Sequence, residues 1–333
     1  EKLYTALNLK YQDFNTAEKT KKAPGRIIEQ AEDATSRAQN TRLFTIAIGL
    51  MMGILLGLVA AFTLEYFNDT IESPEQLEQA LHMSVVGQLP YDEAVNEVEI
   101  LCSDKPNTPI AESFRALRSR LKHSLSERNA KSFLVTSTAV QEGKSFVALN
   151  LAVTFAQFGK NVILVDGDLR RPTLHKKFKV ENKGCTNIFV DKLDYKDLIL
   201  QTDIQNLSIL PSGPLVLTEN TPVISSEIFE SDVMKNMLLE LRQTYDLVVV
   251  DTPPIMAVTD SLIISNLVEG MLFVVSAGDM PNKEIVQAKN ILESADAPLL
   301  GAVLNRTQFT HSYYRYLYYY YDSQTGERRR HRN

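Results

Sequence analysis

The chain has 333 residues and a formal net charge of −6 at neutral pH, with 44% hydrophobic and 23% charged residues. This composition is that of a globular protein, and the negative balance argues against a protein that coats nucleic acid through bulk attraction to phosphate. The two cysteines, Cys102 and Cys185, lie far apart, so they predict neither a disulfide framework nor a zinc cluster. Because the chain begins with Glu1 rather than Met, we expect it to be part of a longer polypeptide.

The first predicted element is a membrane-spanning helix. Residues 43–64 form a run of 22 residues without a charge. At 1.5 Å per residue the run reaches roughly 33 Å, which is enough to cross the hydrocarbon layer. The alternative, a buried core helix, would be unusually long and uniformly apolar. Gly49, Gly53 and Gly57 recur every four residues and form a flat strip that permits close approach of another helix, although glycine is also common in membrane helices in general.

The orientation of this helix depends on what lies on either side. Residues 1–42 hold eight Lys and Arg, whereas the stretch after the helix opens with Glu65 and Asp69. The positive-inside rule alone would place residues 1–42 in the cytoplasm. We expect an extracytoplasmic segment 1–42 instead, because the residues after the helix have the features of a domain that uses ATP, which is cytoplasmic.

After a polar connector at residues 65–110, apolar runs alternate with helical patterns. The runs are short, rich in Val, Ile and Leu, and uninterrupted by polar residues, as is typical of strands buried on both faces. They lie at residues 133–136, 162–165, 207–210, 247–250, 271–275 and 299–304. The pattern predicts an α/β fold with a doubly wound, mainly parallel sheet, in which ligands bind at the carboxyl ends of the strands.

The first of these strands leads into a phosphate-binding loop. Gly143, Lys144 and Ser145 follow the strand, and an apolar helical run at residues 146–158 comes next. At such a turn, backbone N–H groups and the helix dipole hold phosphate, the lysine reaches the outer phosphates and the serine binds Mg²⁺. The predicted nucleotide-binding segment comprises Gln141, Glu142, Gly143, Lys144, Ser145 and Phe146.

Two further strand ends carry carboxylates. Asp166 and Asp168 follow the second strand, and they would point the same way if that strand continued. Asp251 ends the fourth run, in the arrangement of a Walker B motif. We expect Asp166 and Asp251 to join Ser145 at a metal, and either Asp166 or Asp168 to accept a proton. One such Asp is often only a turn or cap residue, but these sites in this order predict a site for ATP and Mg²⁺.

Together, the phosphate loop, the VDGDLRRP segment at residues 165–172 and the VVVDTPP segment at residues 248–254 resemble the bacterial tyrosine kinase family. That family lies within the deviant Walker group, which also holds partitioning and cell-division ATPases. The resemblance covers about residues 65–321, with a kinase domain at residues 111–310. It implies catalysis by Lys144, Asp166 and Asp168, with ATP and Mg²⁺ as cofactors. It also implies nucleotide contacts by Asn305 and Arg306, of which Asn305 would contact adenine.

One segment of the phosphate loop departs from the family pattern. The family usually has Pro-Gly where this chain has Val140 and Gln141. Glycine there permits close backbone approach and an unusual φ, so Gln141 must adopt a tolerated conformation or bend the loop. The loop also lacks the extra lysine that marks the partitioning ATPases. This absence favours the bacterial tyrosine kinases over the partitioning ATPases.

The C-terminal tail, residues 311–333, is rich in tyrosine. Seven of the thirteen tyrosines lie within nine positions: Tyr313, Tyr314, Tyr316, Tyr318, Tyr319, Tyr320 and Tyr321. The cluster favours a multi-site phosphoacceptor like that of the family, and the alternative is an aromatic edge strand or partner-binding patch. At most roughly 28 Å of chain separates Asn305 from Tyr313, so the tail could reach the site of an adjacent subunit.

A ridge on one predicted helix is the last feature. Glu112, Arg115 and Arg118 recur every three residues on a helix that begins near Ala111. The pattern alone also fits a solvated face with a local ion pair. The resemblance implies that these residues form the subunit contact of a ring oligomer.

In full, the resemblance implies an autokinase that phosphorylates its own tail in trans at the bacterial membrane, with the kinase domain in the cytoplasm. It implies that this kinase controls capsular or exopolysaccharide synthesis. It also implies that the kinase is fused to the last membrane helix of a polysaccharide chain-length regulator. The implied partners are a second copy, the membrane, the polysaccharide export and polymerisation machinery, and a protein-tyrosine phosphatase. Two alternatives stay open: a MinD- or ParA-like positioning ATPase with water as the acceptor, and a non-catalytic scaffold for chain-length control.

Overall fold

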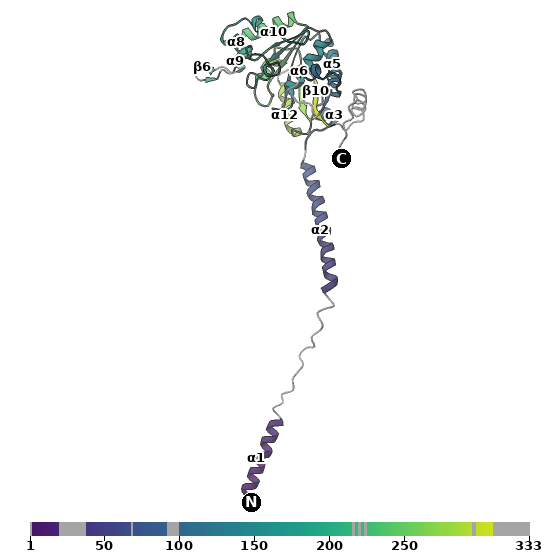
Figure 1. Cartoon of the computed structure of the whole chain (residues 1–333), viewed down its shortest axis with the longest axis vertical. Coiled ribbons are helices and arrows are strands. Elements are labelled where there is room, and N and C mark those ends of the chain that lie inside the picture. Colours follow the sequence, from purple (N-terminus) through teal and green to yellow (C-terminus); the bar gives the residue numbers. More distant parts are fainter. Residues whose placement is uncertain are drawn as a thin grey trace. The chain divides into compact units, whose positions relative to one another are not determined.

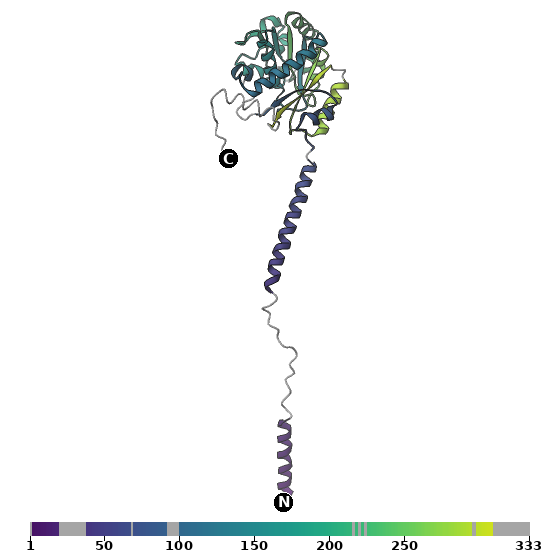
Figure 2. The same ribbon diagram turned by 90° about the vertical axis from the view of Figure 1, so that its right-hand side faces the viewer.

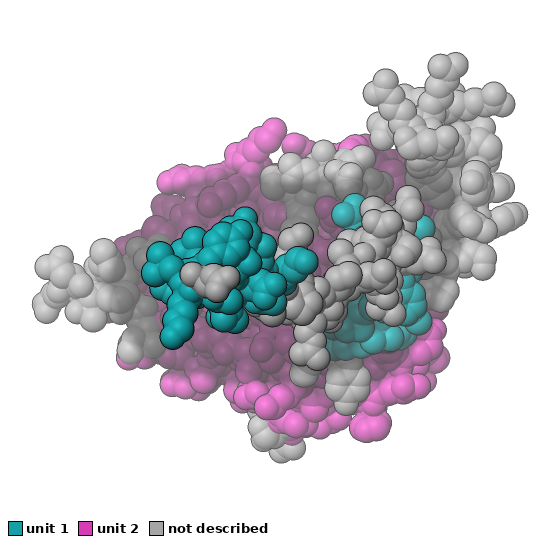
Figure 3. Space-filling view, turned by 90° about the horizontal axis from the view of Figure 1, so that it is seen from below, with its two compact units in different colours: residues 1–67 teal, residues 68–333 magenta. Residues whose placement is uncertain are grey.

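The computed structural model describes residues 2–19, 38–67, 69–91, 100–214, 217–218, 221–222, 225–294 and 298–308. The chain divides into two compact units, Glu1–Phe67 and Asn68–Asn333. Figure 1 shows the elements of both units, and Figure 3 shows the units in different colours.

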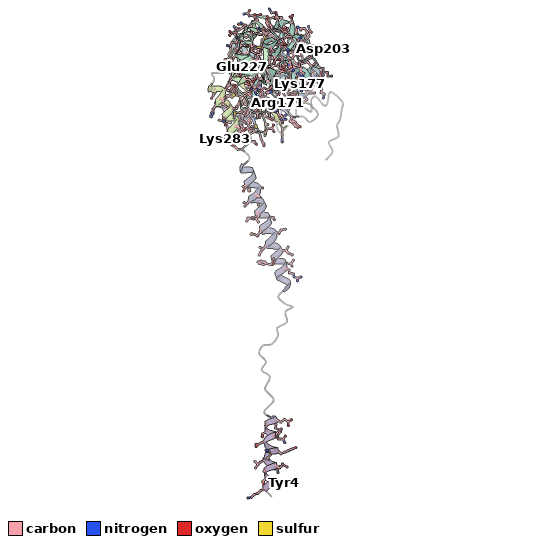
Figure 4. All side chains as sticks on the ribbon, turned by 90° about the vertical axis from the view of Figure 1, so that its left-hand side faces the viewer. Tyr4, Arg171, Lys177, Asp203, Glu227 and Lys283 are labelled. Atoms are coloured by element: carbon pink, nitrogen blue, oxygen red, sulfur yellow. The ribbon has the colours of Figure 1, made fainter. Side chains whose placement is uncertain are left out.

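The first unit contains the predicted membrane helix. Its described residues form α1 (Lys2–Lys19) and α2 (Ala38–Phe67). Within α2, the segment Arg42–Thr63 is 22 residues long and apolar enough to cross a membrane, and none of it is buried in the structure. Figure 4 shows that its side chains project around the helix, and large apolar ones such as Leu43 and Phe62 are exposed. A helix with apolar side chains all round suits lipid rather than one-sided packing against a soluble core.

In the described part of the second unit, eight strands form one sheet in the order β1-β10-β9-β2-β8-β3-β5-β4. Every pair is parallel except β4 with β5. All six predicted runs are strands of this sheet, so the predicted α/β class is confirmed. The strands are β1 (Val85–Pro90), β2 (Ser132–Ser137), β3 (Val162–Asp166), β4 (Leu200–Gln201), β5 (Leu207–Leu210), β8 (Leu247–Asp251), β9 (Met271–Ser276) and β10 (Leu299–Thr307), with a separate antiparallel pair, β6 (Leu217–Thr218) and β7 (Thr221–Pro222).

Helices cover both faces of the sheet, as Figure 2 shows. Residues of β2 alternate between two hydrophobic clusters: Phe133 and Val135 belong to a cluster that includes residues of α5 and α6, whereas Leu134 belongs to a cluster that includes residues of α10 and α12. This two-sided burial explains why the strands read as uninterrupted apolar runs. The helices are α3 (Pro74–Leu81), α4 (Leu101–Asp104), α5 (Pro109–Glu127), α6 (Lys144–Gln157), α7 (Leu174–Lys177), α8 (Cys185–Val190), the 3₁₀ turn η1 (Tyr195–Leu198), α9 (Ser225–Glu230), α10 (Asp232–Thr244), α11 (Asp260–Ser265) and α12 (Asn282–Ser294).

The structure differs from the expectation of a polar connector at residues 65–110. Within its described residues this segment belongs to the folded unit, since Leu77 and Leu81 of α3 are fully buried and β1 extends the sheet beside β10. Helix α3 begins at a capping box, in which the Ser73 hydroxyl accepts the Gln76 N–H and the Gln76 side chain accepts the Ser73 N–H. Folded structure therefore begins a few residues after α2.

Candidate nucleotide site

The predicted phosphate loop lies between β2, which ends at Ser137, and α6, which begins at Lys144. Gly143 has a φ of 87°. A Cβ on Gly143 would lie 2.2 Å from Nδ2 of Asn305, so this position requires glycine for space as well as for conformation. Asn305 Nδ2 donates a hydrogen bond to the carbonyl of Glu142 at 2.9 Å. The end of β10 therefore holds the loop in place.

The Glu142 side chain holds the loop from its inner side. The side chain is buried, and its carboxylate oxygens accept the backbone N–H groups of Ala139 at 2.6 Å and Ser276 at 3.3 Å. Burial raises the pKa of Glu142 to about 7, against the opposing effect of these hydrogen bonds. The loop thus folds around a carboxyl group that changes charge near neutral pH.

We expect Glu142→Gln to change how stability depends on pH. A carboxyl whose pKa is raised in the folded state stabilises the fold fully below its unfolded value of 4.5, and this contribution is lost as the pH rises through about 7. Glutamine does not titrate. As the pH rises from 4.5 to about 7, the free energy of unfolding of the variant should therefore increase by about 3 kcal/mol relative to that of the unchanged chain. Thermal unfolding across the range measures this difference, and a difference that stays constant with pH would refute the assignment.

Lys144 and two carboxylates meet at the ends of adjacent strands. Strands β3 and β8 pair with Asp166 opposite Asp251. Lys144 Nζ lies 2.9 Å from Asp168 Oδ2 and 3.9 Å from Asp251 Oδ1. Burial opposes the charge on Lys144, but Asp251 and Asp168 outweigh burial and raise the pKa of its ammonium group. Lys144 therefore carries its positive charge at neutral pH.

Asp166 and Asp168 face different partners. Strand β3 ends at Asp166, so the strand alternation that would align the two side chains does not continue. Asp166 is fully buried and accepts the backbone N–H groups of Thr173 and Leu174, whereas Asp168 lines the pocket described below. Burial and the nearby charge of Asp251 raise the pKa of Asp166. The two acids of this segment are therefore not equivalent.

The oxygen atoms beside the loop fit a bound Mg²⁺. Both carboxylate oxygens of Asp251 are buried and have no hydrogen-bond partner in the described structure. Burial raises the pKa of Asp251, against the opposing effects of Lys144 and the Ser145 hydroxyl. No group of three or more His, Cys, Asp and Glu side chains suited to a metal occurs among the described residues. Ser145 and Asp251, with Asp166 behind them, would thus supply part of the shell, as is usual where phosphate and water complete the coordination of Mg²⁺.

A pocket of about 360 Å³ opens beside the loop. One wall is basic and holds Arg170, Arg171 and Lys177, of which Figure 4 labels the last two. The lining also includes the apolar residues Pro253, Pro254, Ala257 and Val258. The predicted nucleotide-binding residues that line the pocket are Gln141, Gly143, Lys144, Ser145 and Phe146, and the predicted catalytic residue Asp168 lines it as well. The pocket can therefore hold an anionic group beside an apolar one.

Other predicted residues lie outside the pocket lining. Glu142 and Asn305 hold the loop, and Arg306 pairs with Asp279 at 3.2 Å. The contact of Asn305 with adenine stays a prediction. Sequence reasoning assigned no role to Arg170, Arg171 or Lys177, and the arginine pair of the VDGDLRRP segment was the signal that could have found the first two. The tyrosine cluster, residues 313–321, lies outside the described residues.

Gln141 adopts the glycine-like conformation that its position demands, with a φ of 68°. For a residue with a side chain this left-handed conformation costs about 1 kcal/mol. We expect Gln141→Gly to raise the free energy of unfolding by up to about 1 kcal/mol. The same exchange at Gln243, an exposed position on α10, should lower it by about as much. Chemical denaturation of both variants measures the sign of each change in the free energy of unfolding. If both variants lost the same free energy of unfolding, the backbone of Gln141 would be unstrained.

The predicted interface ridge lies on α5 and makes contacts within its own chain. Glu112 and Arg115 form an ion pair at 2.7 Å. Arg118 donates to the carbonyl of Thr154 at 3.0 Å, and its guanidinium lies 4.6 Å from the centre of the Phe158 ring. The Arg118 contacts join α5 to α6 and its C-cap residue, and the role of the ridge between subunits stays a prediction.

The loop, the strand-end acids and the sheet define a P-loop NTPase. A family model described as ParA, NUBPL iron-transfer P-loop NTPase, matches residues 129–332. This match covers most of the second unit and agrees with the parallel sheet and the position of the phosphate loop.

Comparisons with individual relatives show which group of P-loop NTPases the chain resembles. Putative tyrosine-protein kinase CapB of Staphylococcus aureus is 38% identical over 217 residues, which cover 65% of this chain and 92% of CapB. Tyrosine-protein kinase etk of Escherichia coli K12 is 26% identical over 324 residues, which cover 91% of this chain and 44% of etk, so the chain spans less than half of that relative. The solved kinase domain of Escherichia coli ETK matches with a TM-score of 0.66 and 30% identity over 73% of this chain and 97% of the domain. The chain belongs to the bacterial tyrosine kinase family.

Proposed function

We propose that this chain is an ATP-dependent autokinase that phosphorylates the tyrosine cluster, residues 313–321, of a neighbouring copy. The observation that carries the proposal is the position of Lys144, which lies between Asp168 and Asp251 beside a pocket with a basic wall. This arrangement suits a nucleotide triphosphate, and the family supports tyrosine as the acceptor.

Each residue of the site has a part in the transfer. Lys144 and the N–H groups of the loop neutralise charge on the transferring phosphoryl group. Ser145 and Asp251 would hold Mg²⁺, which would supply positive charge to the phosphate oxygens. The phenolic oxygen forms a bond to the γ-phosphorus while the bond from that phosphorus to the β–γ bridging oxygen breaks, and ADP leaves with the electron pair. Asp168 accepts the phenolic proton, since it lines the pocket whereas Asp166 is fully buried and lies outside the pocket lining.

The setting of this reaction is a membrane-bound oligomer. Asn305 contacts the phosphate loop, and the cluster begins eight residues later, so the acceptor leaves the domain close to a nucleotide site. Helix α2 spans the bacterial membrane with residues 1–42 outside, and the ridge of Glu112, Arg115 and Arg118 forms the contact between subunits. Phosphorylation of the tail would regulate capsular or exopolysaccharide synthesis through the export machinery, and a phosphatase would reverse it.

The test uses the full chain in detergent with γ-labelled ATP and Mg²⁺, and tyrosines are mapped by mass spectrometry. A chain whose seven cluster tyrosines are phenylalanine keeps the site but lacks acceptors, whereas Lys144→Met keeps the acceptors but lacks the site. We expect label on the Lys144→Met chain when the two are mixed, which requires transfer between copies. Free phosphate without labelled tyrosine would instead indicate the positioning ATPase, and nucleotide binding with neither product would indicate the scaffold.

A further inference from the structure

A buried acid, Asp260, joins three segments beside the pocket. Asp260 begins α11 and is fully buried. Its Oδ2 accepts hydrogen bonds from the Ser225 hydroxyl and from Arg170 Nε, the latter at 3.2 Å. Ser225 begins α9, and Arg170 follows Asp168 in the loop after β3. Asp260 thus fixes that loop to two helices on one face of the sheet.

Arg170 is anchored by a single edge of its guanidinium. In the described structure, both hydrogen bonds recorded for its side chain, to Ser225 and to Asp260, use Nε. The side chain is 48% exposed and lines the same pocket as Lys144 and Asp168. Because a guanidinium carries five N–H donors in a planar fork, an anchor at Nε leaves the donors of Nη1 and Nη2 for a ligand in that pocket.

The charged partner of Asp260 is Arg170. A hydrogen bond from Ser225 needs only a neutral acceptor, and Asp260 lies in the first turn of the six-residue helix α11, where an acid is favoured but not required. Moreover, Asp260 Oδ1 is buried with no hydrogen-bond partner among the described residues, which is costly for a carboxylate. In the described structure this carboxylate pairs with the guanidinium of Arg170, which it orients.

We propose that Arg170, held by Asp260, binds the oxygens of the γ-phosphoryl group during its transfer to tyrosine. This assignment rests on the proposed function, because it deepens the role of the same pocket. Lys144 is shared between Asp168 and Asp251, so a second cation on the basic wall would add positive charge beside the phosphoryl oxygens. A guanidinium suits that task since it binds phosphate with two parallel N–H groups. Asp260 is then a positioning residue, which acts on the reaction through Arg170.

The first test is Arg170→Ala in the full chain in detergent. We expect kcat to fall by about 10²–10³-fold, as on loss of one preorganised donor. Affinity for a non-hydrolysable ATP analogue should fall about tenfold, whereas affinity for ADP, which has no γ-phosphate, should stay within about twofold. Added methylguanidinium should restore part of the rate. Lys176→Ala removes an exposed cation of α7 outside the pocket lining and should change none of these quantities.

The second test separates positioning from structural support. Asp260→Asn keeps the shape of the side chain and an acceptor for Ser225 but loses the charge, so kcat should fall about tenfold at unchanged ADP affinity. The double variant with Arg170→Ala should be no slower than Arg170→Ala alone, because both changes remove one interaction. The inference is overturned if the ADP and ATP-analogue affinities fall together and methylguanidinium restores nothing. Absence of labelled tyrosine in the unchanged chain would sink the proposed function instead, while the binding comparison still decides the role of Arg170.

Discussion

Lys144→Met should lower phosphorylation of the tail tyrosines by about 10³-fold or more. Methionine has a similar length but no charge, so Asp168 and Asp251 would face the phosphate oxygens without the cation that lies 2.9 Å and 3.9 Å from them. The loss should fall on kcat, because Lys144 acts where charge develops in the transition state. Single-turnover labelling at saturating ATP measures it.

The control for this variant is Lys144→Arg, which keeps a positive charge in a different shape. Removal of the cation leaves two buried acids unpaired, so Lys144→Met should also lower the Tm, whereas Lys144→Arg should lower it less. If Lys144→Arg lowered kcat while its Tm stayed near normal, the loss of rate would come from the phosphoryl transfer and not from a loss of stability. If Lys144→Met labelled its tail as fast as the unchanged chain, Lys144 would have no part in the transfer.

Asp251→Asn is expected to lower the rate by about 10²–10³-fold while making the nucleotide-free protein more stable at pH 8. Both oxygens of Asp251 are buried without a hydrogen-bond partner among the described residues, and burial raises its pKa although Lys144 opposes this effect. A raised folded-state pKa means that ionised Asp251 destabilises the fold at high pH, and asparagine removes that penalty. Stability and activity should therefore move in opposite directions.

Two measurements check this prediction. Thermal unfolding with EDTA at pH 8 and at pH 4 should show a larger gain for Asp251→Asn at the higher pH. Rates measured against Mg²⁺ concentration should show that the variant needs more metal. A drop in Tm at both pH values would mean that Asp251 is a structural acid, and an unchanged Mg²⁺ requirement would remove it from the metal site.

Local patterns predicted most of the sheet. The six apolar runs were identifiable because two-sided burial removes polar residues from a strand, as at Phe133 and Leu134 of β2. Strand β1 was not identifiable, because Val85–Pro90 contains Gly87 and Pro90, which are uncommon in strands. Its place in the sheet comes from pairing with β10, which no local pattern reveals.

The site was predictable where its residues are neighbours in sequence. Lys144 and Ser145 follow from the loop motif, since its chemistry is local. The divergence of Asp166 from Asp168 was not predictable, because it depends on β3 ending at Asp166. The ion pair of Arg170 with Asp260 joins residues 90 positions apart in the sequence. It was therefore not predictable from a local pattern and becomes visible only in the folded structure.

The pairing of β1 with β10 has a consequence for biosynthesis. Val85 of β1 pairs with Ala302 of β10. The ribosome must therefore add roughly 200 further residues after β1, which takes about 10–40 s of translation, before β10 has been synthesised. Until then the edges of β1 and β9 are open to wrong pairing while α2 has already left the ribosome. A chain that stops before β10 should therefore aggregate or be held by chaperones. The tyrosine cluster follows β10, so the acceptor emerges only when the sheet that completes the enzyme can close.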